Sequence, residues 1–498
     1  MASYIDIDKK FNNITQIGSG NYENIYKVFD ATRNEYFAMK ITFIDDNFII
    51  DPTTLREMSN LKKIKDNNIV ELVDVSFGLF YKKKCVYLLL ELCGTTLFHN
   101  FENQNYNINI FNKIKDVVSI LHHNGFYHGD ISFLNIMINN NKEVKLIDFG
   151  TARRIYRKYD TDYKPSLMIQ PIEFFNNNFN NVNGTKIDVW SLGCIYYKFK
   201  TCDYLIDPVN PRYKKTFMNK FKRICKNAKL QNDDKYLLNN LLHIDPNQRN
   251  LRSNNNTMHN FNINNYNIKI KQKNIFNQMS QFDKFNIILF FNEFIKTNNM
   301  EDEVLFLTIV NSKKIMGKSN GDPKDNLTWF IILFWLSNEI ISINTLSKED
   351  IYTYLSKVES DISNLGVIYR NICQRLGWDI DGNTMYNYIE YIPDDLKEFY
   401  KGLILYLEIS NYHSDNLIYM LGGILNIFKD KYNVCFEKLE EFISNTGIKY
   451  NFEHESYKIK IHVKNVVNKN DEVQQFLKYY FLMTNDLDTY NGICDIGS

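Results

Sequence analysis

The sequence predicts an α+β domain, followed by an all-α domain made of two helical repeats. Strand-like alternation of apolar and polar residues is concentrated in residues 14–45, and longer helical patterns follow it. An asparagine-rich segment without periodicity then precedes a second half in which apolar residues recur at spacings of three and four. A chain of 498 residues is also too long for one ordinary hydrophobic core, so at least two domains are expected.

The composition is that of a soluble globular protein, with 44% hydrophobic and 23% charged residues. The net charge of +1 gives no reason to expect nucleic acid or an anionic membrane as the main partner. The N-terminus has no apolar signal core, and the most apolar stretch, residues 329–336, is too short to span a bilayer. The eight cysteines form no C-x-x-C pair, which favours reduced thiols over disulfides or a zinc site. We therefore expect an intracellular protein of the cytoplasm or nucleus.

Residues 125–150 carry the most specific chemical pattern. They contain H-G-D-I-S-F-L-N and end in D-F-G, and two short apolar runs between these motifs predict a hairpin. The hairpin can bring Asp130, Asn135 and Asp148 into one cleft, where their oxygens would suit a magnesium–phosphate site. The stretch resembles the catalytic loop and metal-binding turn of protein kinases, which usually have H-R-D. This resemblance implies a bilobal protein kinase fold over residues 11–251, with Asp130 as catalytic base and Asn135 and Asp148 as ligands of Mg²⁺.

A glycine-containing turn, I-G-S-G-N-Y, is the candidate phosphate loop. Gly18 and Gly20 would let backbone amides approach phosphate oxygens, although an ordinary hairpin turn is the alternative. The usual third glycine of the kinase loop is Glu23 here, which predicts weaker ATP binding. Lys40, in A-M-K on the third expected strand, would reach the α- and β-phosphates.

The next expected helix contains D-P-T-T-L-R-E, and Glu57 projects from it. Glu57 would pair with Lys40 and hold the lysine over the phosphates. The helix is similar to the P-S-T-A-I-R-E helix of cyclin-dependent kinases, which a bound cyclin rotates inward; a generic kinase helix is the alternative. The resemblance thus makes Lys40, Glu57, Asp130 and Asn135 the catalytic residues.

An apolar strand at residues 86–92 leads into the expected hinge between the lobes. Leu90 would face the back of the adenine pocket, and Glu91 and Cys93 would offer backbone hydrogen bonds to the base. The resemblance implies ATP as the nucleotide and assigns its contacts to Ile17, Gly18, Ser19, Gly20, Asn21, Tyr22, Ile25, Ala38, Lys40, Leu90, Glu91, Cys93 and Met137.

The same resemblance implies structural roles for three residues. Glu173, in the place of the glutamate of A-P-E, is expected to form a buried ion pair with Arg249. Asp188, in D-V-W-S-L-G, should hold the backbone of the catalytic loop.

The activation segment departs from the pattern of its relatives. Gly129 replaces an arginine that in relatives helps to grip a phosphate, while Arg56 and Arg153 supply the other two guanidinium groups. Thr161 stands at about the phosphorylated position, and with one guanidinium missing we expect weaker dependence on phosphorylation.

Two further departures concern rate and substrate. Ser132 replaces a lysine near the γ-phosphate, which should slow transfer. Cyclin-dependent kinases favour a serine or threonine followed by proline, and they use a residue with positive φ in the activation segment for this purpose. Pro165 stands at the matching position and cannot adopt a positive φ, and Gln170 stands in place of a supporting arginine. Proline-directed specificity is therefore not expected.

Residues 252–277 are expected to be an asparagine-rich linker. Beyond it, helices are expected at 282–296, 301–316, 326–341, 348–376, 395–407, 415–428, 437–445 and 473–483. Their order resembles the cyclin fold, with a first cyclin-box-like bundle at 278–383 and a second bundle at 384–498. Asn338 stands where the family has its signature lysine, and any helical accessory domain would show similar periodicity.

These observations favour an ATP-dependent serine/threonine protein kinase that acts on a protein substrate. An intramolecular interface between the kinase and the cyclin-like domain would activate it in cis. The alternative is a pseudokinase or scaffold that binds partners through both halves, which Glu23, Gly129 and Ser132 favour. A small-molecule kinase is a third reading, against which the P-S-T-A-I-R-E-like helix counts.

Overall fold

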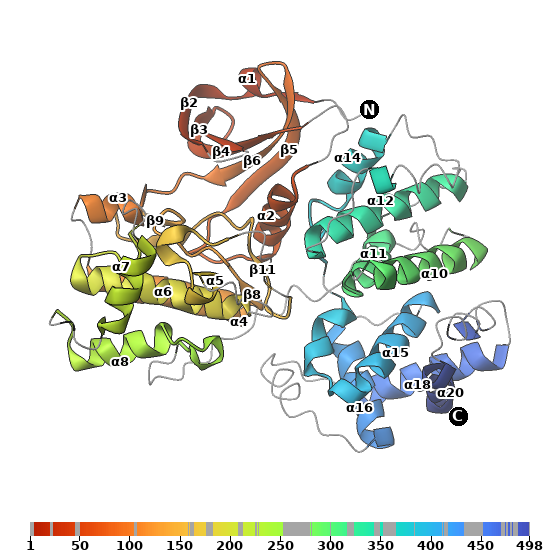
Figure 1. Cartoon of the computed structure of the whole chain (residues 1–498). Coiled ribbons are helices and arrows are strands. Elements are labelled where there is room, and N and C mark those ends of the chain that lie inside the picture. Colours follow the sequence, from red (N-terminus) through yellow and green to blue (C-terminus); the bar gives the residue numbers. More distant parts are fainter. Residues whose placement is uncertain are drawn as a thin grey trace. The chain divides into compact units, whose positions relative to one another are not determined.

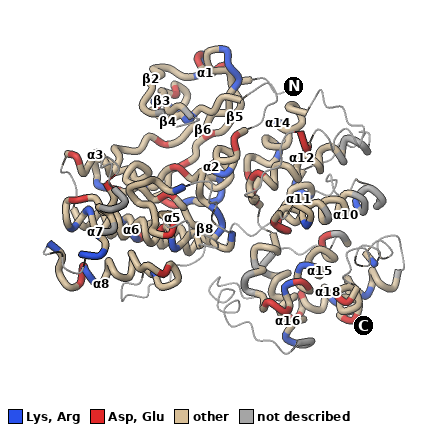
Figure 2. Tube along the Cα trace, in the orientation of Figure 1, with Lys and Arg blue, Asp and Glu red and all other residues tan. Residues whose placement is uncertain are grey.

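The computed structural model shows two compact units, residues 1–259 and 260–498 (Figure 1). The description below covers residues 4–19, 23–44, 50–103, 107–157, 159, 164–175, 183–207, 213–224, 227, 229–251, 279, 281–298, 300–315, 323–342, 349–351, 365–382, 384–410, 412, 417–432, 452–469, 474, 477–478, 481 and 487–497. The expected linker, residues 252–277, lies outside this range, so the domain boundaries stay predictions. Positions of Lys and Arg (blue) and of Asp and Glu (red) are spread over both units (Figure 2).

The first unit begins with a six-stranded sheet in the order β1-β5-β6-β4-β3-β2. All neighbouring strands are antiparallel except β1, which pairs in parallel with β5. The strands are β1 (Ile5–Asp6), β2 (Asn12–Ser19), β3 (Glu23–Asp30), β4 (Glu35–Phe43), β5 (Leu72–Phe80) and β6 (Lys83–Glu91).

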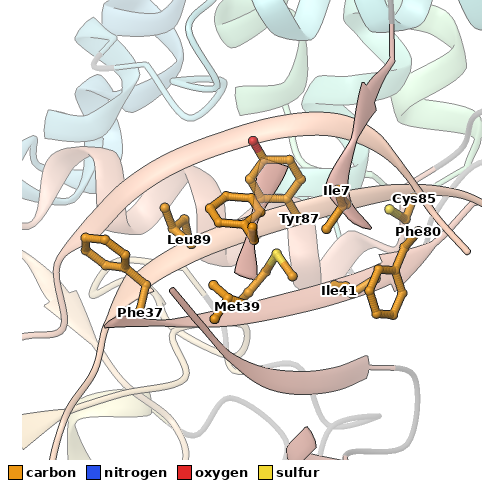
Figure 3. Close-up of a cluster of buried hydrophobic side chains, with 10 residues drawn as sticks. Ile7, Phe37, Met39, Ile41, Phe80, Cys85, Tyr87 and Leu89 are labelled. Atoms are coloured by element: carbon orange, nitrogen blue, oxygen red, sulfur yellow. The ribbon is translucent and has the colours of Figure 1, made fainter. Parts of the chain in front are cut away.

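Alternate side chains of β4 and β6 build the core of this sheet (Figure 3). Phe37, Met39 and Ile41 come from one face of β4, as the two-residue period of a strand requires. Ile7, at the start of the short helix α1 (Ile7–Lys10), is fully buried in the same cluster. The N-terminal segment therefore adds both an edge strand and a core residue to the sheet, which the sequence had not predicted.

Helix α2 (Pro52–Lys63) carries Glu57. Its start is well defined, because the Asp51 carboxylate accepts hydrogen bonds from the N–H groups of Thr53 and Thr54 and proline occupies the first turn. Residues 54–61 of this helix are buried on all sides. A helix buried in this way holds its side chains in fixed positions.

The helical lobe of the first unit centres on α6 (Gly184–Thr201), which is almost wholly buried. The predicted hairpin is confirmed, since β9 (Ile136–Ile138) and β10 (Val144–Leu146) pair antiparallel. Among its described residues the first unit also contains β7 (Thr95–Thr96), α3 (Leu97–Glu102), α4 (Ile108–His123), β8 (Phe126–Tyr127), β11 (Arg153–Arg154), η1 (Leu167–Ile169), α5 (Ile172–Phe175), α7 (Tyr213–Lys222), α8 (Asn232–Leu241) and η3 (Pro246–Gln248).

The described residues of the second unit form helices and no strand. The helices are α10 (Gln281–Thr297), α11 (Glu303–Lys314), α12 (Pro323–Ile341), α14 (Leu365–Arg375), η6 (Met385–Tyr391), η7 (Asp394–Leu396), α15 (Lys397–Ile409), α16 (Leu417–Tyr432), α18 (Phe452–Lys469) and α20 (Leu487–Gly497). The sequence had not predicted α18 or α20. The helix expected at 437–445 and the middle of the one expected at 348–376 lie outside the described residues, as does part of the one at 473–483.

The most apolar stretch, residues 329–336, lies in α12 and is fully buried there, as expected of a core helix. None of the helices in the described ranges has the length and apolar character needed to cross a membrane.

Ion pairs connect α11 with α15, and so join the two halves of the second unit. Lys313 Nζ pairs with Glu408 Oε2 at 2.5 Å and also donates to the Glu408 carbonyl oxygen at 2.8 Å. Lys401 Nζ lies 2.6 Å from Asp302 Oδ2. These charged groups hold helices of the second unit together.

Candidate active site

A buried ion pair lies at the centre of the sheet. Lys40 Nζ on β4 lies 2.6 Å from Glu57 Oε2 on α2, and the two side chains are 8% and 1% exposed. The same ammonium lies 3.4 Å from Asp148 Oδ1. The ammonium is therefore held between two carboxylates, one fixed by a buried helix and one at the end of the β9–β10 hairpin.

The Asp130 carboxylate receives hydrogen bonds from two sides. Asn135 Nδ2 donates to Asp130 Oδ2 at 3.0 Å and to the Asp130 carbonyl oxygen at 3.0 Å. Ser166 donates its backbone N–H to Oδ1 at 2.8 Å and its hydroxyl to Oδ2 at 3.1 Å. Burial raises the pKa of Asp130, and the hydrogen bonds from Ser166 act in the opposite direction.

The backbone of the catalytic loop is held by Asp188, as predicted. Asp188 Oδ2 accepts the N–H of His128 at 2.8 Å, and Oδ1 accepts the N–H of Gly129 at 2.8 Å. Asp188 is fully buried on α6. Because α6 is almost wholly buried, the loop bearing Asp130 is fixed to a helix in the interior of the lobe.

Two hydrogen bonds tie this loop to the segment bearing Asp148. The N–H of Ile147 donates to the Asn135 carbonyl oxygen at 3.0 Å, and His128 Nε2 lies 3.0 Å from the Ile147 carbonyl oxygen. Residues far apart in sequence thus meet at one place. The charge of Lys40 lowers the pKa of Asp148, so Asp148 is ionised at neutral pH.

Asn135 and Asp148 offer a donor set that fits Mg²⁺. The Asn135 amide nitrogen is directed to Asp130, which leaves its side-chain oxygen as the group able to bind a cation. The Asp148 side chain is 47% exposed and anionic. Hard oxygen ligands of this kind suit Mg²⁺, which keeps the rest of its shell for phosphate and water.

Some of the residues expected to bind the nucleotide lie on neighbouring strands of the sheet, and others lie outside the described residues. Ala38 lies opposite Leu90 in the β4–β6 pairing, and Ile25 lies opposite Lys40 in the β3–β4 pairing. Ile17 is 51% exposed, and Met137 lies half-buried on β9. Gly20, Asn21 and Tyr22 lie outside the described residues, while Gly18 and Ser19 end β2.

The hinge is braced by the side chain of Glu91. Its Oε1 accepts the Lys145 ammonium at 2.6 Å and the N–H of Glu71 at 2.8 Å. The Glu91 N–H donates to the Glu71 carbonyl oxygen at 3.1 Å, and the Cys93 thiol donates to the Glu91 carbonyl oxygen at 3.8 Å. Burial raises the pKa of the Cys93 thiol to about 12, which keeps it neutral.

The arginines expected to meet a phosphate are buried. Arg56 Nε donates to the Gly150 carbonyl oxygen at 3.2 Å, and Arg153 lies on β11 with 2% exposure. Thr161 lies outside the described residues. The ion pair expected between Glu173 and Arg249 is confirmed as a bidentate contact of 2.8 and 2.7 Å.

Two serines that touch this site were not assigned these contacts from the sequence. Ser166 binds Asp130 across 36 positions of sequence, which no local pattern reveals. Ser132 had been noted only for the absent lysine, but its Oγ accepts the N–H groups of Leu134 and Asn135 at 3.3 and 3.2 Å. The sequence signal for such a turn is a serine in a loop, because its hydroxyl can accept hydrogen bonds from the backbone N–H groups two and three residues later.

The sequence matches the protein kinase domain family over residues 11–261, which is half of the chain. The chain therefore belongs to the protein kinase family. Among its relatives, cyclin-dependent kinase-like 1 of Caenorhabditis elegans is 28% identical over 39% of this chain and 56% of its own length. CTD kinase subunit alpha of Schizosaccharomyces pombe is 31% identical over 38% of this chain and 33% of its own. Mitogen-activated protein kinase 4 of Oryza sativa subsp. japonica is 31% identical over 38% of this chain and 54% of its own. The chain thus spans between about a third and just over half of the length of these relatives.

Proposed function

We propose that the first unit transfers the γ-phosphoryl group of ATP to serine or threonine hydroxyls of protein substrates. The observation that carries this proposal is the meeting of two groups of residues. Lys40, Glu57 and Asp148 form one, Asp130 and Asn135 form the other, and the hydrogen bond from Ile147 to Asn135 joins them. The Ser166 hydroxyl, 3.1 Å from Asp130 Oδ2, indicates that an alcohol fits beside this carboxylate.

In this reaction Asp130 orients the acceptor hydroxyl and takes its proton as the new oxygen–phosphorus bond forms. The bond between the γ-phosphorus and the bridging oxygen breaks, and ADP leaves. Lys40, held by Glu57, positions the α- and β-phosphates. Magnesium, when bound by Asn135 and Asp148, would supply charge neutralisation for the phosphates.

The test is phosphate transfer to a degenerate serine/threonine peptide library. The purified chain is incubated with radiolabelled ATP and Mg²⁺, and the products are analysed for phosphoserine and phosphothreonine. We expect label on both that disappears when EDTA is added. No label on any peptide, with nucleotide still bound, would contradict the kinase proposal.

That outcome would instead favour a scaffold that binds nucleotide or partners without transfer. Three residues favour this second candidate, since Glu23, Gly129 and Ser132 all depart from the kinase pattern. The structure weakens the argument from Ser132 for a scaffold, because the Ser132 hydroxyl has a structural role in supporting the turn before Asn135.

We further propose that the second unit acts as a cyclin-like activator of the first. Support comes from the D-P-T-T-L-R-E sequence of α2 and from the helical second unit that follows in the same chain. Tethering would give the activator a high effective concentration, so no separate cyclin would be needed.

A protease site inserted within residues 252–277 tests activation in cis. The intact chain should keep its specific activity on dilution, whereas the cleaved chain should lose activity as dilution separates the units. Cleaved protein that stays fully active at all dilutions would contradict this proposal. Deletion of residues 278–498 should also lower kcat.

A further inference from the structure

Gly129 lies at a position where both the backbone conformation and the neighbouring Tyr159 ring disfavour a side chain. Its φ is +82°, and a Cβ added there would lie 3.1 Å from Tyr159 Cε2 and 3.4 Å from the Thr151 carbonyl oxygen. L-residues with side chains rarely adopt this φ, and a contact of 3.1 Å is tighter than ordinary packing. The space beside Gly129 is therefore taken by the ring of Tyr159.

Tyr159 is itself firmly packed. It is 5% exposed and belongs to a buried cluster with Tyr127, Phe174 and Ile187. Its ring lies edge-on to Phe174, with centroids 5.7 Å apart, and 6.1 Å from the Tyr127 ring. These contacts join the segment after D-F-G to β8, α5 and α6, so the tyrosine has a fixed position from which its hydroxyl can act.

The hydroxyl of Tyr159 donates to the Gly129 carbonyl oxygen at 3.3 Å. This carbonyl belongs to the peptide that joins Gly129 to Asp130. The N–H of Gly129 is held by Asp188 at 2.8 Å, so the backbone just before Asp130 is held by two different elements. Ser166 then binds the Asp130 side chain itself.

We propose that Tyr159 is a positioning residue that fixes the Gly129–Asp130 peptide, so that Asp130 is held in place by aromatic packing and needs no phosphate on the neighbouring segment. The proposal rests on the proposed kinase function for its kinetic consequences, but its structural content is independent of that function. The Tyr159 ring lies 3.1 Å from where the Cβ of any larger residue at position 129 would lie.

Tyr159→Phe tests the hydroxyl, because the phenylalanine ring keeps the packing. We expect kcat to fall about fivefold, as loss of one neutral hydrogen bond allows, with an unchanged KM for ATP. Tyr196→Phe is the matched control, since it removes a buried hydroxyl that donates to Asp234 at 2.7 Å, away from the catalytic loop. A kcat for Tyr159→Phe equal to that of the control would overturn the proposal.

Gly129→Ala is a second variant that leaves the tyrosine intact. Its Cβ would push against the Tyr159 ring at a strained φ, so we again expect a lower kcat with a similar KM for ATP. Gly129→Arg, which restores the usual H-R-D motif of the family, should lower kcat further. A gain of activity in the arginine variant would contradict the packing argument.

Two readouts separate this proposal from the kinase proposal. Hydrogen exchange measures the amides of residues 126–135 directly, and Tyr159→Phe should speed their exchange while Tyr196→Phe should not. Protein treated with phosphatase and repurified should keep its kcat within about twofold. Wild-type protein without any transfer would count against the kinase function alone. The role of Tyr159 would be contradicted if amide exchange in residues 126–135 were unchanged in Tyr159→Phe. It would also be contradicted if phosphatase treatment abolished transfer.

Discussion

The two units bury charged groups in different ways. In the first unit, Lys40, Glu57 and Asp148 come from three separate elements and converge on one place that is partly open to solvent. In the second unit, Lys313 and Glu408 join two helices, and both side chains are largely buried. The comparison teaches that charged groups from several elements that meet at an accessible carboxylate indicate a candidate active site. A buried ion pair between two neighbouring helices indicates instead a role in holding the helices together.

Neutralising Asp148 is expected to have the largest effect on kcat and therefore gives the strongest test of this comparison. Asp148→Asn should lower kcat by about 10³-fold, because the anionic oxygen expected to hold Mg²⁺ and to face Lys40 is lost. The measurement is phosphate transfer at saturating ATP over a range of Mg²⁺ concentrations. Asp116→Asn, on the exposed face of α4, is the control and should behave as wild type. Full rescue of Asp148→Asn by millimolar Mg²⁺ would point to a different ligand set.

Glu57→Gln should have a smaller but still large effect. Lys40 would lose its closest carboxylate, so we expect kcat to fall about 30-fold and the free energy of unfolding to drop because a buried charge loses its partner. Kinetics and a thermal melt measure the two effects. The control is Glu102→Gln, at the exposed end of α3. Wild-type kinetics in Glu57→Gln would remove the lysine–glutamate pair from the mechanism.

Ser132 distinguishes the sequence-based interpretation from the structural one. If the missing lysine limits the rate, Ser132→Lys should raise kcat. The structure predicts the opposite, because the Ser132 hydroxyl supports the amides of Leu134 and Asn135. We expect both Ser132→Ala and Ser132→Lys to lower kcat about fivefold. Ser132→Thr, which keeps the hydroxyl, should retain most of the activity. A faster Ser132→Lys enzyme would refute the supporting role.

In the second unit the smallest effect is expected, and it concerns stability alone. Burial lowers the pKa of Lys284 to about 8, with the charge of Lys313 adding to the effect. The unfolded chain, with a lysine pKa of about 10.4, then binds more protons than the folded chain between about pH 8 and pH 10.4. The stability of this unit should therefore rise with pH across that window.

Lys284→Met removes the cost of burying this charge. It should raise the Tm of the second unit by about 5 °C at pH 7, and the gain should disappear near pH 10. A Trp190→Phe background makes the melt specific, because the remaining tryptophans, Trp329, Trp335 and Trp378, all lie in the second unit. A gain that is the same at both pH values would show that packing, not charge, is responsible. Transfer activity at pH 7 should not change.

Much of the first unit could be predicted from its sequence, because its motifs combine residue type with fixed spacing. The β9–β10 hairpin, the Asp188 contacts and the Glu173–Arg249 pair were all expected and are present. In the second unit, periodicity alone predicted five helices to within a few residues of α10, α11, α12, α15 and α16. It could not assign a function, since any packed helix shows the same spacing.

The rest could not be predicted for physical reasons. The parallel pairing of β1 with β5 joins residues more than 70 positions apart through the two residues of β1, and no local propensity specifies it. Tyr159 is one of three tyrosines in residues 156–163, no period distinguishes it from Tyr156 or Tyr163, and its contact with Gly129 depends on tertiary packing. The Ser166 contact with Asp130 is of the same kind.

The most direct test of the account is the rate of phosphate transfer by wild type and Asp130→Asn, measured side by side on the same peptide library. The account predicts that wild type transfers phosphate and that its kcat falls at acidic pH as Asp130 becomes protonated. This fall should occur at a higher pH than for an ordinary aspartate, because burial raises the pKa of Asp130. The account also predicts at least about a 10³-fold loss in Asp130→Asn, with an unchanged thermal melt and retained nucleotide binding. An Asp130→Asn enzyme that transfers phosphate at the wild-type rate would contradict it.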